Sequence, residues 1–137
     1  MNNTKLFIIL GNQLFNPNLY FKQINQYDFF LCEDYGLCSY VKHHKLKLLH
    51  VLSSMRLYKD ELKSLGLKVH YNSIEDENFY EDYLEKLKKT LSKNKYKKLF
   101  FFEIEDKFFE KKLLTLNKDV EIEVIKSPMF LFWKKRV

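Results

Sequence analysis

Cysteine, glycine, proline and arginine are all scarce in this sequence of 137 residues. Its two cysteines, Cys32 and Cys38, provide neither a disulfide framework nor a paired C-x-x-C metal motif. No apolar run approaches the roughly 20 residues that a membrane-spanning helix needs, and residues 1–13 contain no small-residue cleavage site. These absences argue against disulfide-rich secreted proteins and membrane partners, and they favour a cytoplasmic location.

The formal charge of +6 comes almost wholly from lysine, because Arg56 and Arg136 are the only arginines. A basic balance favours an anionic partner such as a nucleic acid. However, the lysines are spread along the chain and interleaved with acidic residues, which is typical of a solvated surface. We therefore do not predict that this chain binds DNA specifically by itself.

Apolar residues make up 46% of the sequence, which is enough to fill the core of one domain and argues against a disordered chain. Short apolar runs bounded by Gly, Asn or Pro predict strands, whereas apolar residues at steps of three and four predict helices. The predicted strands are 5–10, 27–33, 67–71, 99–104 and 120–125. The predicted helices are 41–65, a second that begins at 79 and ends near the lysine-rich residues 92–98, and a third over 108–116.

Strands that alternate with helices imply right-handed crossovers and a parallel sheet covered on both faces. We therefore predict one doubly wound α/β domain over residues 1–137, with a five-stranded, mainly parallel sheet. Ligands of such sheets bind beyond the carboxyl ends of the strands. The loops at 11–14 and 33–36, which follow the first two strands, are therefore the predicted pocket.

A metal site is not predicted, although several possible ligands lie close together in the sequence. These residues are Cys32, Asp34, Cys38, His43 and His44. Adjacent histidines on a helix point about 100° apart, so both cannot easily face one ion. The sequence also lacks a histidine pair four residues apart, which is the helical arrangement typical of zinc sites.

Phosphate-binding and hydrolytic motifs are also absent. Residues 11–14 lack the glycines and the lysine of dinucleotide and phosphate loops, although a single glycine permits a flat ligand to approach the backbone. No G-x-S-x-G elbow is present. The carboxylates Glu103, Glu105 and Asp106 could form a functional cluster, but they are more typical of an acidic helix N-terminus.

Four segments together resemble the photolyase-related family of prokaryotes, which includes iron–sulfur bacterial cryptochromes and (6-4) photolyases. The segments are LGNQL (10–14), YVKHHKLKL (40–48), VLSSMR (51–56) and ELKSLGLKVHY (61–71). An acidic residue, Glu33, also follows the second predicted strand, as in that family. The resemblance implies the Rossmann-like N-terminal domain of a photolyase.

The resemblance also implies an antenna chromophore similar to 6,7-dimethyl-8-ribityllumazine. The residues that would bind it are Gly11, Asn12, Gln13, Leu14, Glu33, Tyr40, His44 and Met55. Gln13 would bond the edge of the ring, and Glu33 would accept hydrogen bonds from ring N–H groups or ribityl hydroxyls. Tyr40, His44 and Met55 would supply stacking and shape. Asn12 stands where the family has Asp, so one charge is lost from the loop.

FAD, a [4Fe–4S] cluster and DNA are bound in that family by a helical domain that we expect this chain to lack. Two cysteines are too few for four cluster ligands, and Trp133 alone cannot form a tryptophan electron-transfer chain. We therefore expect an antenna domain that is not catalytic by itself and joins an FAD-binding helical domain in cis or in trans. It would meet DNA only through the complete protein. The alternative is a non-catalytic nucleotide-binding or protein-docking module of the same fold.

Overall fold

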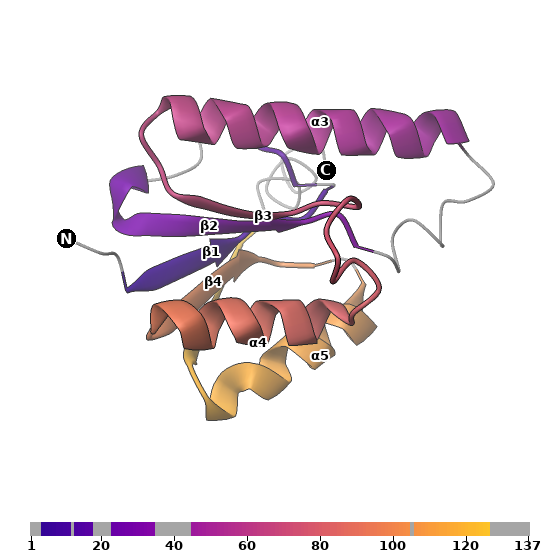
Figure 1. Ribbon diagram of the computed structural model, residues 1–137. Coiled ribbons are helices and arrows are strands. Elements are labelled where there is room, and N and C mark those ends of the chain that lie inside the picture. Colours follow the sequence, from indigo (N-terminus) through magenta and orange to yellow (C-terminus); the bar gives the residue numbers. More distant parts are fainter. Residues whose placement is uncertain (1–3, 12, 18–22, 35–44, 105, 127–137) are drawn as a thin grey trace, which may run out of the picture.

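The computed structural model describes residues 4–11, 13–17, 23–34, 45–104 and 106–126. For residues 45–48 it describes the backbone alone. Within these ranges one twisted sheet separates two layers of helices (Figure 1). None of the helices in this part of the chain is long and apolar enough to cross a membrane.

The sheet consists of five parallel strands in the order β3-β2-β1-β4-β5. The strands are β1 (Lys5–Ile8), β2 (Tyr27–Cys32), β3 (Val69–Asn72), β4 (Lys98–Phe102) and β5 (Glu121–Ile125). The chain starts in the middle of the sheet, proceeds to one edge and then crosses to the other. This order confirms the doubly wound, Rossmann-like α/β fold predicted from the sequence, and every strand pair is parallel.

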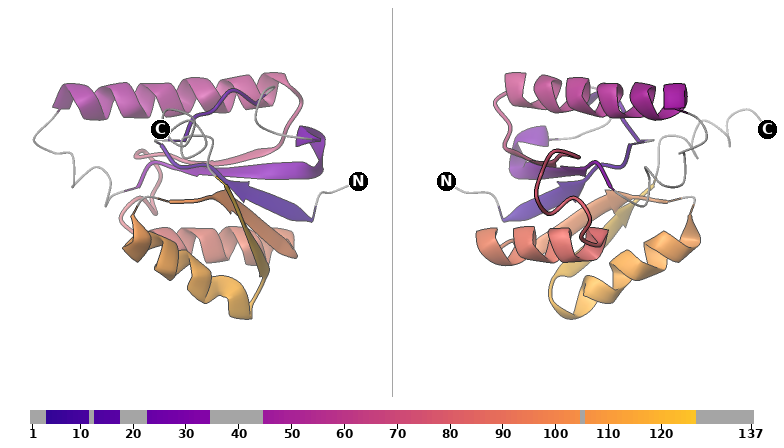
Figure 2. Two further views of the ribbon diagram at one scale, coloured as in Figure 1. Left: turned by 180° about the vertical axis from the view of Figure 1, so that it is seen from behind. Right: turned by 45° about the vertical axis from the view of Figure 1, so that its right-hand side comes forward.

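Helices cover both faces of the sheet. Helix α3 (Lys45–Ser64) lies on one face, and α4 (Tyr83–Asn94) and α5 (Lys107–Leu114) lie on the other (Figures 1 and 2). Two 3₁₀ turns, η1 (Ile24–Gln26) and η2 (Thr115–Lys118), precede β2 and β5. Each helix between two strands therefore crosses the sheet to reach the next parallel strand.

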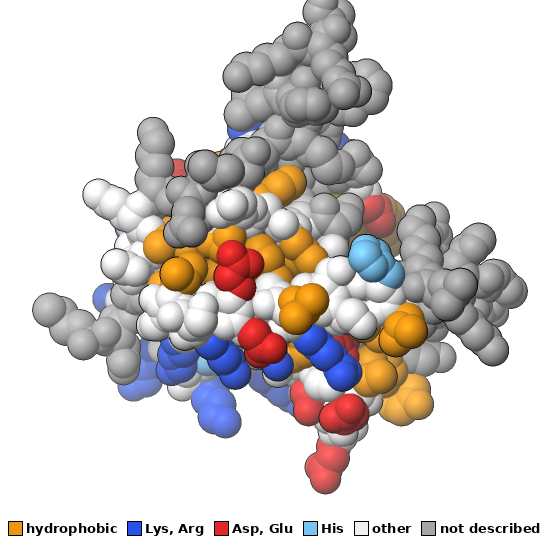
Figure 3. Space-filling model, turned by 90° about the horizontal axis from the view of Figure 1, so that it is seen from above, with side chains coloured by type: hydrophobic (Ala, Val, Ile, Leu, Met, Phe, Trp, Pro, Cys, Tyr) orange, Lys and Arg blue, Asp and Glu red, His pale blue; other side chains and the backbone are white. Residues whose placement is uncertain are grey.

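The first long helix was predicted from an apolar stripe, and the structure buries most of that stripe. Leu52, Met55, Tyr58 and Leu62 are buried against the sheet. Gly66 follows the helix with φ of +82°, a conformation that favours glycine, and this confirms the predicted stop. The outer side of α3 also carries exposed apolar side chains among charged ones, as the view from above shows (Figure 3).

The second predicted helix begins later than its apolar pattern suggested. Residues 79 and 80 lie in a turn, Asp82 is extended, and α4 starts at Tyr83. The amine of Lys86 donates to the carbonyl of Phe79 at 2.7 Å, and its ammonium lies 5.3 Å from the centre of the Phe79 ring. Phe79 therefore contacts Lys86 from a turn that precedes the helix, and it does not form the first turn of the helix itself.

Aromatic rings fill the core between the sheet and α3. The ring of Phe7 lies 5.0 Å from that of Phe102 and 5.3 Å from that of Tyr27, and it also stacks on Phe29 and Phe100. On the opposite face, aliphatic side chains from β1 and β4 pack against α4 and α5. Both faces of the central strands are therefore buried, as expected for a doubly wound sheet.

Candidate functional site

The carboxyl ends of β1 and β4 meet at Gln13. Its side chain is buried, and Nε2 donates to the carbonyl of Glu103 at 3.0 Å. Its Oε1 is also buried and has no hydrogen-bond partner in the part of the chain that the structure describes. A buried acceptor without a partner is costly, so a donor that reached this atom would stabilise the folded protein.

Gly11 lets the loop after β1 approach α3 closely. A Cβ at this position would lie 3.2 Å from both Met55 Sδ and Val51 Cγ1. That spacing is tighter than ordinary van der Waals contact, so a larger residue would push the loop away from the helix. Leu14, three residues later, packs half-buried against the aromatic core. Gly11 is therefore held against α3, and Leu14 against the aromatic core.

Glu33 is fully buried at the carboxyl end of β2, and both of its carboxylate oxygens are held by the protein. Arg56 donates from Nε to Oε2 at 2.8 Å and from Nη2 to Oε1 at 3.0 Å. The Ile74 amide donates to Oε1 at 3.0 Å, and the Tyr71 hydroxyl donates to Oε2. Four donors occupy the usual acceptor positions of a carboxylate, so Glu33 joins α3, β3 and the loop after β3.

These contacts determine the ionisation of the Glu33 carboxyl. Burial by itself would raise its pKa, but the hydrogen bonds from Arg56, Tyr71 and the Ile74 amide outweigh burial and hold the pKa below its ordinary value. Burial and the neighbouring carboxylate raise the pKa of the Tyr71 hydroxyl, which therefore stays a proton donor at neutral pH. Glu33 is thus a fixed anion, paired with a fixed cation.

The sequence interpretation had not assigned Arg56 and Tyr71 to the site. One signal was present, because a buried carboxylate needs a cationic partner and Arg56 is one of only two arginines in the chain. Arg56 is 40% exposed, and no acceptor among the described residues contacts its Nη1. Its guanidinium therefore retains donors at the protein surface beside the carboxyl end of β2.

The other predicted residues differ in how far the structure describes them. Met55 is buried on α3 and faces Gly11. Asn12, Tyr40 and His44 lie outside the described residues, so their predicted roles stay predictions. The structure thus brings Gly11, Gln13, Leu14, Glu33 and Met55 to one end of the sheet.

A second polar cluster lies between the sheet and α4. The hydroxyl of Tyr96 donates to the buried carboxylate of Asp28, so His70 Nε2 must donate its proton to the Tyr96 oxygen, at 2.7 Å. Burial and the nearby charge of Lys68 lower the pKa of His70, and Asp28 opposes them only in part. The folded protein therefore favours the neutral form of this imidazole.

This lowered pKa predicts how stability depends on pH. The unfolded chain takes up a proton at His70 near pH 6.5, before the folded chain does, so the free energy of unfolding should decrease as pH falls from 7 toward the folded pKa. Urea unfolding at several pH values measures this slope. His70→Gln should flatten it, whereas the matched change His50→Gln on exposed α3 should not. An unchanged slope in His70→Gln would show that other groups cause it.

No group of His, Cys, Asp and Glu among the described residues could hold a metal ion. Burial raises the pKa of the Cys32 thiol to about 12, and the nearby Lys86 ammonium lowers it only in part. A buried thiol with such a pKa is unreactive.

Asp106 caps α5 by accepting from the amides of Phe108 and Phe109, at 3.0 and 3.2 Å, which confirms its predicted role at a helix N-terminus.

Comparison with known proteins agrees with the resemblance seen in the sequence. Residues 7–137 match the family described as "Deoxyribodipyrimidine photo-lyase-related protein". Over 75 residues the chain is 36% identical to a protein named "(6-4) photolyase" from Agrobacterium fabrum (strain C58 / ATCC 33970). That match covers 53% of this chain but 15% of the relative, which is a much longer protein. The chain therefore belongs to the deoxyribodipyrimidine photo-lyase-related family.

Proposed function

We propose that this chain is the antenna-chromophore-binding domain of a photolyase- or cryptochrome-related protein that acts in light-dependent DNA repair. Family membership supports the general role, and the relative named a (6-4) photolyase supports the link to repair. The observation that carries the proposal is the buried Oε1 of Gln13, which has no partner among the described residues. A flat heteroaromatic such as 6,7-dimethyl-8-ribityllumazine carries a ring N–H that would satisfy this acceptor.

Each residue at the carboxyl ends of the strands has a role in this proposal. Gln13 would accept from the ring, while Gly11 and Met55 form the closely packed wall behind the loop. Glu33 would act indirectly, because its oxygens already accept four protein hydrogen bonds. It would hold Arg56 so that the remaining guanidinium donors can contact the ribityl hydroxyls. This role replaces the direct contact between Glu33 and the chromophore expected from the sequence.

The bound lumazine would supply absorption of near-ultraviolet and blue light. We further propose that the acceptor of this energy is FAD in a helical domain, joined in cis or in trans, and that DNA is met only by the complete assembly. The named relative is far longer than the segment that this chain matches, which leaves room there for such a domain.

Titration of the full chain with 6,7-dimethyl-8-ribityllumazine, followed by absorption and fluorescence, tests the antenna role. Gln13→Leu should weaken binding about three- to tenfold, because one buried hydrogen bond contributes roughly 0.5–1.5 kcal/mol. The matched control is Gln26→Leu in η1, at the opposite end of the strands, where the side chain accepts from Lys5 instead.

Equal affinities in the two glutamine variants would remove Gln13 from the site without deciding against an antenna. If the unmodified chain shows no saturable binding of the lumazine, the antenna proposal fails, and a protein-docking or nucleotide-binding role of the same fold becomes the better explanation. A melting temperature measured for each variant separates loss of binding from loss of folding.

A further inference from the structure

One strongly basic segment includes most of α4 and the start of β4. Residues 85–98 hold seven of the 24 lysines and arginines but only one of the 18 acidic residues, so the rest of the chain carries 17 of each sign. This segment of α4, the turn after it and Lys98 therefore carries a net charge of +6. The lysines of this segment are therefore not interleaved with acidic residues, unlike the lysines of the sequence as a whole.

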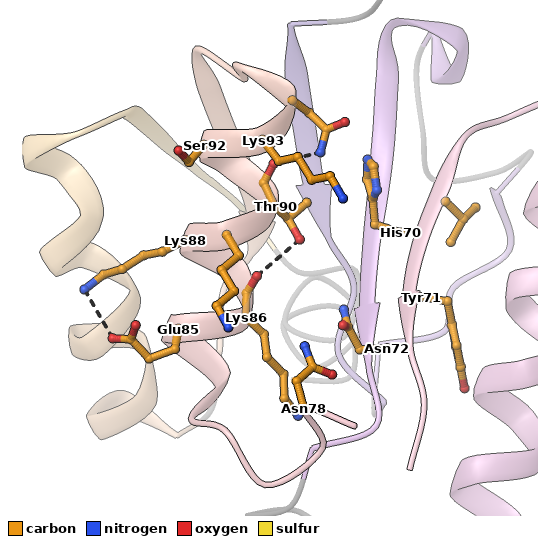
Figure 4. Close-up of a pocket in the computed structure, with 13 residues that line it drawn as sticks. His70, Tyr71, Asn72, Asn78, Glu85, Lys86, Lys88, Thr90, Ser92 and Lys93 are labelled. Atoms are coloured by element: carbon orange, nitrogen blue, oxygen red, sulfur yellow. Dashed lines mark hydrogen bonds and ion pairs between the residues drawn. The ribbon is translucent and has the colours of Figure 1, made fainter. Parts of the chain in front are cut away.

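This segment borders a groove of about 870 Å³ between α4 and β3. Its lining includes His70 and Asn72 from β3, Asn78 from the loop, and Lys89, Lys93 and Asn94 from α4. Lys93 extends from α4 toward His70, whereas Lys88 points away from the strand to Glu85 (Figure 4). Lys93 forms no ion pair within the described ranges, and Lys89 pairs with the half-exposed Glu81 at 2.7 Å.

The other side of the groove is the open edge of the sheet. β3 is the terminal strand of the described sheet and pairs with β2 alone. The carbonyls of Lys68 and Asn72 accept from the amides of Phe29 in β2 and of Glu33 directly after it, at 2.9 and 2.8 Å. Because main-chain groups alternate in direction along a strand, those of Val69 and Tyr71 point away from β2, toward the open edge. An edge of this kind can pair with a further strand.

We propose that this groove docks an extended acidic segment of a partner protein, which adds beside β3 as a sixth strand. Its main chain would pair with Val69 and Tyr71, as in other cases of strand addition. Since side chains alternate between the two faces of a strand, every second residue would point toward α4. Those residues would be Asp or Glu, facing Lys89 and Lys93. The proposal does not depend on chromophore binding, because Gln13 does not line this groove.

The combination of features favours a peptide over a nucleic acid. Lysines and asparagines alone would also suit phosphates. Phosphates, however, make no use of an alternating row of main-chain N–H and C=O groups, whereas a peptide strand pairs with both. The lysines that line the groove all come from α4. On the other side of the strand edge, Lys59 of α3 covers the Tyr71 ring at 4.8 Å and pairs with Asp60 at 3.6 Å. A ligand with acidic residues on one face matches this asymmetry.

The test uses the full chain and an end-capped peptide of alternating glutamate and valine, with affinity measured by fluorescence anisotropy at low salt. The variant K89Q/K93Q should weaken binding three- to tenfold, since exposed ion pairs are weak and two are lost. The control K111Q/K112Q removes the same charge from α5 and should leave affinity within twofold. Binding should also slow hydrogen exchange at the amides of Val69 and Tyr71.

Two altered ligands test the strand geometry. A peptide of the same composition with its glutamates in one block, or one N-methylated on alternate amides, should bind at least fivefold more weakly. Equal binding of these peptides, or equal losses in the two lysine variants, would overturn the proposal in favour of nonspecific charge attraction. Tighter binding of a single-stranded oligothymidylate that is also lost in K89Q/K93Q would overturn it in favour of a phosphate site.

Discussion

Arg56→Ala should lower the free energy of unfolding by about 3–5 kcal/mol at pH 7, which is the usual effect of leaving a buried charge without its partner. The substitution removes two hydrogen bonds and the cation from Glu33, whose side chain is fully buried. Tyr71 and the Ile74 amide remain as donors, but neither carries a charge. For a domain of this size the melting temperature should decrease by roughly 10–20 °C, as differential scanning calorimetry would show.

The reciprocal variant, Glu33→Ala, should cost less. It leaves Arg56 without a partner, but that side chain is 40% exposed and can be hydrated where it stands. We therefore expect a loss of about 2–3 kcal/mol, smaller than a fully buried ion would cause. The double variant removes both charges and should be more stable than Arg56→Ala alone. If all three variants lose the same stability, the carboxylate is not the buried charge that the structure indicates.

The pH dependence that Glu33 gives to stability should have opposite signs in the unchanged protein and in Arg56→Ala. In the unchanged protein the Glu33 pKa is lowered, so its contribution is complete above the ordinary pKa near 4.5 and is lost as pH falls through the folded pKa. In Arg56→Ala burial would dominate and raise the pKa. The folded state would then bind a proton before the unfolded chain, and the variant would gain stability as pH falls toward 4.5. Urea unfolding at pH 7 and pH 5 would show the difference between the two proteins shrinking.

The sheet was predictable because its determinants are local in the sequence. Apolar runs at 5–10 and 99–104 predicted two central strands, and Gly66 marked the end of a helix. Alternation of strands and helices then required parallel pairing through crossovers. The start of α4 shows the limit, because the apolar pattern begins at Phe79 but the helix begins at Tyr83. Its end at Asn94 lies where the sequence predicted it, although Lys95 with φ of +55°, and not a glycine, follows it.

The site was less predictable because its contacts join distant segments. Glu33 was correctly placed after the second strand, yet its donors come from α3, β3 and the loop beyond β3. Arg56 is 23 residues away in the sequence and Ile74 is 41 residues away. No local pattern indicates which polar groups will meet at the ends of parallel strands. A sequence motif could therefore identify Glu33 as a residue of the site. It could not show that other groups of the protein already donate to both of its carboxylate oxygens.

Phe7→Ala should destabilise the domain by about 3–5 kcal/mol, the range found when a buried phenylalanine is removed from a core. Phe7 is 1% exposed at the centre of β1 and contacts four other rings, from β2 and β4. The cavity would lie beneath α3, so the helix that positions Met55 and Arg56 would lose part of its support. The matched control is Phe108→Ala on α5, where the ring is 73% exposed and the expected change is within about 0.5 kcal/mol. Urea unfolding of both variants measures the difference, and equal losses would contradict the packing described for the central strand.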